Sequence, residues 1–144
     1  MPNLARTLFD PVGKTAQIDH WVNQAYTTSY ILSAGQVTLT ARPNDTLVSR
    51  EDFEYSLLQI RKWIAMIRQE GFTPAKVPVT LSVEIKKNSE TVYSAEFSTG
   101  GLKISEISWN GSVLTFEGRP ERVITFSAFE RWFKFLERVL EDIS

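Results

Sequence analysis

Glu84 and Lys86 are the two residues whose types and spacing come closest to a catalytic arrangement. They lie two positions apart in a segment, Val77 to Lys86, in which apolar and polar residues alternate. Because side chains on a β-strand alternate between its two faces, both would project from the same face. A carboxylate beside an ammonium group could bind Mg²⁺ and orient a water molecule for hydrolysis. This segment is therefore the first candidate for metal-dependent chemistry.

The run Val83-Glu84-Ile85-Lys86 resembles the core of the PD-(D/E)xK nucleases, in which the carboxylate binds Mg²⁺ and the lysine orients water. The resemblance covers this one strand. It implies an upstream aspartate on a neighbouring strand, but the nearest upstream acids fall in a predicted helix or, at Asp45, in a predicted loop. We therefore favour Glu84 and Lys86 as solvated residues on the polar face of a sheet, and keep a metal-dependent nuclease as the more distant alternative.

The other catalytic patterns are incomplete. The chain has no cysteine and one histidine, His20, which excludes thiolate chemistry and multi-histidine metal sites. Gly13-Lys14-Thr15 matches only the end of a phosphate-binding loop, because Leu8 stands where the loop needs its first glycine. No Gly-x-Ser-x-Gly nucleophile motif occurs. We therefore predict no catalytic residue, no metal and no cofactor, and favour a binding protein over an enzyme.

Composition predicts one soluble domain. The chain has 144 residues, of which 42% are hydrophobic and 23% charged, with a formal net charge of −1. No apolar run approaches the roughly 20 residues that span a bilayer, and no signal-peptide pattern follows Met1. We therefore expect a cytoplasmic protein. Basic and acidic residues are mixed along the chain, which disfavours nucleic acid as the partner.

Two amphipathic helices are predicted, over residues 49–71 and 127–143. Ser49 supplies the N-terminal cap of the first helix and Gly71 its left-handed end. Ser127 and Glu130 form a capping box at the start of the second, and Lys134 is spaced to pair with Glu130 and Glu137. Apolar residues recur at helical spacing in both, namely Phe53, Leu57, Ile60, Ile64 and Ile67, then Phe129, Trp132, Phe133, Leu136, Val139, Leu140 and Ile143.

Antiparallel strands are predicted over residues 77–126. Turns are expected at Lys87 to Glu90, at Thr99 to Gly101 and at Asn110-Gly111. The apolar phase changes along the third strand, which indicates a β-bulge near Ser105–Glu106. Residues 1–48 are harder to assign: we expect a helix over Thr15 to Thr28, then two strands on either side of Ala34-Gly35.

The predicted fold is therefore α+β, with an antiparallel sheet of four to six strands and two or three helices on one face. Residues 1–144 form one domain. A strand followed by Ser-x-x-acid and an amphipathic helix occurs at 37–67 and again at 123–143, although residue identity is too low to define a repeat.

Surplus apolar residues on the helices point to contact with another protein or with a second copy of the chain. Phe135 widens the apolar face of the last helix, and we expect it to form a contact edge with Trp132 and Val139. Tyr55 and Met66 share the face of the first helix opposite its main stripe. The other interpretation is that these are isolated hydrophobic residues on the surface of a monomer. Another protein or a second copy is the favoured partner.

A single-stranded nucleic-acid binder is the main alternative. Tyr93 and Trp109 could stack on bases while Lys86, Lys87 and Lys103 contact phosphates. Antiparallel sheet followed by an aromatic helix, over Val77 to Ile143, resembles the layout of the PC4/Whirly-like proteins, without a matching motif. Those proteins depend on concentrated basic residues, which this chain does not show.

Overall fold

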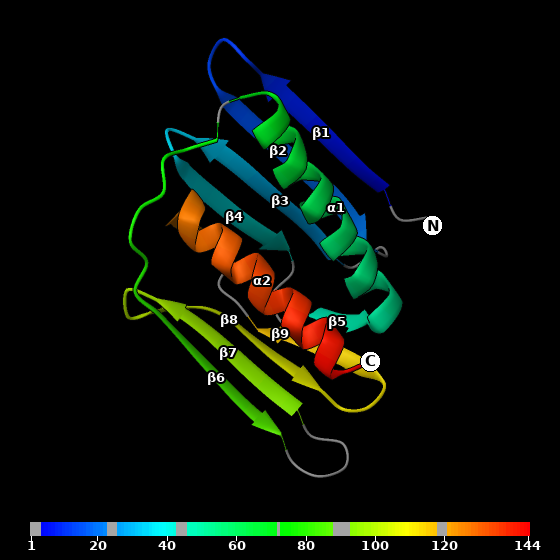
Figure 1. Ribbon diagram of the computed structural model, residues 1–144. Coiled ribbons are helices and arrows are strands. Elements are labelled where there is room, and N and C mark those ends of the chain that lie inside the picture. The colour runs from blue at the N-terminus through cyan, green and yellow to red at the C-terminus, as the bar shows by residue number, and fades with distance from the viewer. Residues whose placement is uncertain (1–3, 23–25, 43–45, 72, 88–92, 118–120) are drawn as a thin grey trace.

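The computed structural model describes residues 4–22, 26–42, 46–71, 73–87, 93–117 and 121–144 (Figure 1). Its two helices are α1 (Arg50–Gln69) and α2 (Phe126–Asp142). The strands are β1 (Leu4–Asp10), β2 (Thr15–Val22), β3 (Tyr26–Ser33), β4 (Gln36–Arg42), β5 (Thr46–Ser49), β6 (Leu81–Lys87), β7 (Tyr93–Thr99), β8 (Leu102–Trp109), β9 (Val113–Glu117) and β10 (Glu121–Thr125). The predicted α+β class with antiparallel pairing is confirmed.

The strands form two sheets where one was predicted. Sheet A has the order β1-β2-β3-β4-β10 and sheet B the order β5-β9-β8-β7-β6, each with five strands. The helix predicted over Thr15–Thr28 is wrong, because the described residues of this segment lie in strands β2 and β3. Ala16 and Ile18 are buried while Gln17 is only partly so, a period of two that the helical interpretation overlooked.

The two halves of the chain have the same architecture. Each half is a four-strand meander, a fifth strand and a helix, and each fifth strand joins the other half's sheet: β5 pairs with β9, and β10 pairs with β4. At the helix caps and at the turns before the fourth strands, equivalent positions are 76 residues apart, as for Ser49 and Thr125 and for Gly35 and Gly111. The strand-and-helix recurrence noted in the sequence corresponds to this repeat, but Ser49 is equivalent to Thr125 and not to Ser127.

The helices lie side by side and antiparallel, on the same side of the two sheets in Figure 1. Arg61 of α1 forms an ion pair with Glu137 of α2, and Arg68 forms one with Glu130. Arg61 and Glu137 are 76 residues apart, the same separation as the two helix caps, so this ion pair joins equivalent positions of the two halves. The pairs predicted between Lys134 and these glutamates are replaced by contacts between helices.

Capping was predicted correctly for one helix only. Ser49 Oγ accepts a hydrogen bond from Asp52 N at 3.1 Å, and Gly71 follows α1 with a φ of 81°. At α2, however, Thr125 Oγ1 caps the helix by accepting from Ala128 N at 3.1 Å. Ser127 Oγ accepts from Val77 N instead. Strand β10 therefore runs directly into α2, two residues earlier than the capping box predicts.

Antiparallel strands occupy the predicted region, but some of them begin or end at other residues than predicted. Regular pairing in β6 begins at Leu81, four residues after Val77. The bulge is confirmed one residue from its predicted place: Phe97 pairs with Ser105 and Ser98 with Lys103, which leaves Ile104 as the extra residue. At the Asn110-Gly111 turn, Gly111 has a φ of 92°. The turn predicted at Lys87–Glu90 lies mostly outside the described residues.

Candidate interaction surfaces

The predicted contact edge on the last helix lies in the core. Trp132 is 6% exposed, Phe135 5% and Val139 0%. The Phe135 ring lies 5.4 Å from that of Phe97, centroid to centroid, and Trp132 Nε1 donates to Ser105 Oγ at 3.0 Å. Because α2 packs against both sheets and against α1, its apolar face has to be wide. The chain itself already covers the surface that appeared surplus in the sequence.

Tyr55 and Met66 are the two predicted contact residues that reach the surface. Met66 is exposed on α1, and Tyr55 is partly buried, which raises the pKa of its hydroxyl. Leu58, which the sequence analysis missed, is exposed at helical spacing between them. Lys62 continues the same line, so these apolar residues do not form an uninterrupted patch.

The structure divides the five residues of the nucleic-acid alternative between two faces of sheet B. Tyr93 pairs with Lys87 and with Trp109 in register, on the face toward α2. Tyr93 is buried and its hydroxyl donates to Asp142 Oδ2 at 2.9 Å; burial and this hydrogen bond both raise the pKa of Tyr93. Lys86 and Lys103 lie on the opposite face, so the two rings and these two lysines do not form one binding platform.

Three carboxylates lie in a row on that opposite face of sheet B. Glu84 pairs in register with Glu96, and Glu96 with Glu106, across β6, β7 and β8. Lys103 Nζ lies 3.0 Å from a carboxylate oxygen of Glu106 and 3.4 Å from one of Glu96, and these two carboxylates raise the pKa of Lys103. Such ion pairs offset the repulsion between neighbouring glutamates.

The pair considered for nuclease chemistry is exposed. Lys86 Nζ lies 3.3 Å from Glu84 Oε1, and both side chains are more than half exposed. Among the described residues, no group of three or more histidine, cysteine, aspartate or glutamate side chains is arranged to hold a metal ion. Glu84 and Lys86 do share a strand face, as predicted, but the described neighbours of the pair add no third ligand.

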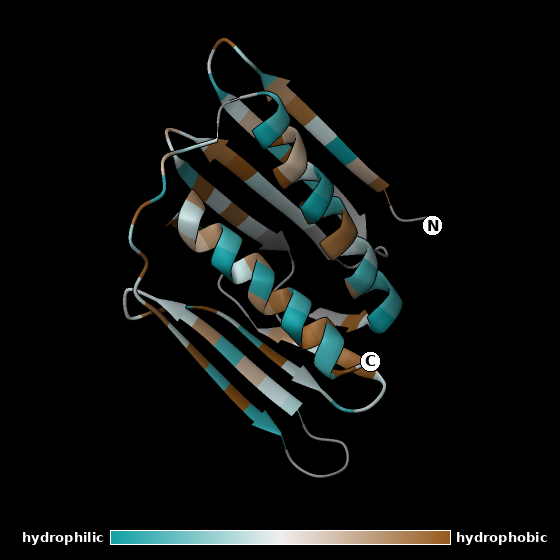
Figure 2. Ribbon diagram, in the orientation of Figure 1, coloured by the Kyte–Doolittle hydropathy of each residue, from teal (hydrophilic) through white to brown (hydrophobic). Residues whose placement is uncertain are grey.

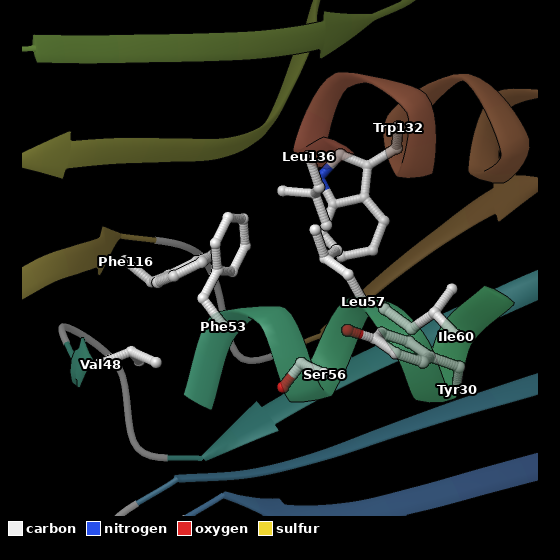
Figure 3. A pocket seen from close by; sticks show the side chains of 9 residues that line it. All are labelled: Tyr30, Val48, Phe53, Ser56, Leu57, Ile60, Phe116, Trp132 and Leu136. Atoms are coloured by element: carbon white, nitrogen blue, oxygen red, sulfur yellow. The ribbon is translucent and has the colours of Figure 1, made fainter. Parts of the chain in front are cut away.

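The gap shown in Figure 3 is a small space inside the core. Side chains of both helices and both sheets line it, including Tyr30, Phe53, Leu57 and Trp132, and Ser56 lies at its edge. Its volume is about 10 Å³, which is roughly the room that one water molecule needs. A substrate or cofactor would not fit, so we assign no small-molecule site here.

Strand β6 is the most exposed element of sheet B. None of its seven residues is buried, and it pairs with β7 on one side only. Leu81 and Val83 are each 38% exposed, although their alternation with polar residues predicts a buried apolar face. Figure 2 shows this alternation of hydrophobic and hydrophilic residues along β6. The prediction fails because α2 packs on β7, one strand in from the edge.

Comparison of the chain with protein-family models, with curated proteins and with solved structures gives no match. Within the described residues, neither helix combines the length and the hydrophobicity needed to cross a membrane. The function is therefore argued from the geometry of the surfaces described above.

Proposed function

We propose that this chain is a non-enzymatic, cytoplasmic binding protein that associates with a second copy of itself through β6. The observation that carries the proposal is the edge of sheet B, where β6 pairs with no second described strand and the outward-facing backbone groups of alternate residues lie beside partly exposed apolar side chains. An exposed edge strand can pair with a strand of another chain, which adds main-chain hydrogen bonds to apolar contact. Such pairing would join the two copies' B sheets into one.

Charge complementarity selects one register for this pairing. Antiparallel pairing centred on Ile85 places Glu84 of each copy opposite the partner's Lys86, and Ile85 opposite the partner's Ile85. A register centred on Glu84 would place two glutamates opposite each other, and one centred on Lys86 two lysines. Opposite charges directly across a strand pair stabilise it and like charges destabilise it. The pattern thus favours one closed, isologous dimer.

The equivalent edge strand of sheet A is less suited to this role. On β1, Arg6 donates to the buried Asp19 at 2.8 Å, and Asp10 accepts from the backbone of Val12 and Gly13 in its own turn. The charges of β1 are therefore engaged within the chain. On β6, the ion pair of Glu84 and Lys86 is exposed, so its groups are free to exchange partners.

A charge-reversal series measured by light scattering tests the proposal. We expect a dimer for the wild type and mostly monomer for Glu84→Lys. In this variant both of the Glu84–Lys86 pairs between the copies would become lysine–lysine pairs, which repel. The double variant Glu84→Lys/Lys86→Glu should restore the dimer, since the complementary pairs return in reversed order.

The single variant also serves as a folding control. Glu84→Lys breaks the exposed ion pair with Lys86 and places a lysine opposite Glu96 instead. Because both positions are at the surface, the monomer should stay folded, as circular dichroism would show. A monomeric wild type at high concentration, or a dimer that Glu84→Lys leaves intact, would contradict the proposal.

A further inference from the structure

A shallow groove lies between α2 and the segment that leads from α1 into β6. It has a volume of about 460 Å³ and is bordered by Val77, Pro78 and Val79 on one side and by α2 on the other. Four cationic side chains, those of Arg68, Lys76, Arg131 and Lys134, line it together with one acid, Glu130. Small-molecule sites have volumes of about 300–1,000 Å³, so the groove has room for a small ligand.

The excess of positive charge results from the way the helices pair. Glu130 forms its ion pair with Arg68, and Glu137 forms one with Arg61, so both glutamates are engaged by α1. Lys134, which the sequence places within reach of both, has no ion pair with any described residue. Lys76 and Arg131 likewise have none within the described part of the chain. Three cations therefore line one groove without an ion pair to any described residue.

The wall of the groove is held in place by hydrogen bonds. Val77 N donates to Ser127 Oγ at 3.1 Å, which ties the connecting segment to the first turn of α2. Gly100 N donates to Thr80 O at 2.9 Å, which ties the same segment to sheet B. The groove exists before a ligand enters, so binding does not have to order this segment first.

The start of α2 adds to the positive potential. Ser127, which lines the groove, lies in the first turn of α2, and no acidic residue occupies that turn. The N-terminus of a helix carries a partial positive charge, which acidic residues usually offset. Here the cationic side chains and the N-terminus of α2 both favour the binding of an anion in the groove.

We propose that this groove binds a small phosphate-bearing anion with about three or more negative charges, such as an organic di- or triphosphate. Arg131, Lys134 and Lys76 would hold its phosphate groups, since guanidinium and ammonium groups form charge-assisted hydrogen bonds to phosphate oxygens. Val77 to Val79 would contact its apolar part. This inference is independent of self-association, because the residues that pair along β6 do not line the groove.

Titration calorimetry with inorganic tripolyphosphate at low ionic strength tests the site. We expect saturable binding to the wild type that weakens as salt is added, because salt screens exposed charges. The variant Arg131→Gln/Lys134→Gln should lose about 10-fold or more in affinity, since each charge-assisted contact is worth more than a neutral hydrogen bond. The variant Lys14→Gln/Lys62→Gln removes two exposed charges outside the groove and should bind as the wild type does.

Three outcomes would overturn the proposal. The first is no saturable heat with the wild type. The second is an equal loss of affinity in the two double variants, which would mean that net charge alone attracts the anion. The third is equally tight binding of citrate, a carboxylate of similar charge, which would show that the groove does not select phosphate. Circular dichroism of each variant confirms that the fold is retained.

Discussion

At the scale of single residues, Asp19 is a buried carboxylate held by three neighbouring side chains. It is 7% exposed, and its carboxylate accepts from Ser29 Oγ at 2.7 Å, from Arg6 Nη2 at 2.8 Å and from Gln17 Nε2 at 3.1 Å. Burial alone would raise the pKa of Asp19, but these hydrogen bonds and the nearby guanidinium together lower it. No sequence pattern predicts this network, because its members lie on three strands.

Replacing Asp19 by Asn should lower the free energy of unfolding by about 1–3 kcal/mol at neutral pH, since the amide would turn a donor toward other donors. The pKa of Asp19 is lower in the folded chain than its ordinary value of 3.8. The carboxylate therefore stabilises the fold above that value, and this contribution is lost as pH falls through the folded pKa.

Urea denaturation of wild type and Asp19→Asn across the acid range checks both points. The difference between the two proteins should be largest near neutral pH and should shrink below pH 3.8. Glu141→Gln, at an exposed position on α2, should follow the wild type throughout. A difference that stayed constant with pH would show that the carboxylate's charge is not what stabilises the strand network.

At the scale of elements, α2 is a core helix packed between two sheets and a second helix. The aromatic rings of α2 contact neighbours on several sides. The Phe129 ring centroid lies 5.6 Å from that of Trp63 in α1 and 5.4 Å from that of Tyr30 in sheet A. The Phe135 ring contacts Phe97 of sheet B. A helix with one neighbour needs a narrow apolar stripe, whereas this one needs a wide face. Its aromatic richness therefore reflects the number of its neighbours.

Phe135→Glu should therefore unfold the chain, and not convert a dimer into folded monomers. The substitution would place a carboxylate in an apolar site beside Phe97, where an unpaired charge costs several kcal/mol. Thermal denaturation followed by circular dichroism would show this loss. Lys62→Glu, at an exposed position on α1, should stay folded. A folded, monomeric Phe135→Glu variant would instead place the contact edge on α2, as the sequence first indicated.

At the scale of the whole molecule, the exchange of fifth strands joins the two halves. Strand β5 completes sheet B although it belongs to the first half, and β10 completes sheet A although it belongs to the second. The antiparallel helix pair adds two ion pairs and the contact of Trp63 with Phe129 across the same boundary. Neither half is then a complete folding unit.

Fragments 1–75 and 76–144 should each fail to fold as monomers when expressed separately, because each lacks the strand that pairs with its fourth. Mixing the two should restore the native circular dichroism spectrum and a one-to-one complex by light scattering. A stable, folded monomer of fragment 1–75 would show that its own four-strand meander is sufficient, and would contradict this dependence on the other half.

Several local features could be predicted from the sequence. The cap at Ser49, the turn at Asn110-Gly111 and the bulge beside Ser105 each depend on a few neighbouring residues, and the structure confirms them. The helix expected at Thr15–Thr28 was wrong because the apolar residues there fit both a helical and a strand period, and only pairing partners distinguish them. A local pattern indicates which secondary structures a segment can form, and long-range contacts decide which of them it adopts.

The sequence by itself thus determined the α+β class, the two long helices and the strands between them, because these follow from periodicity and capping within short windows. Only the tertiary structure decided the exchange of β5 and β10, the burial of Trp132, Phe135 and Val139, and the exposure of β6. These depend on which elements meet in space. Apolar residues recur at the same spacing in the sequence whether they pack within their own chain or against another protein. Only the packed structure shows which apolar surface is left exposed.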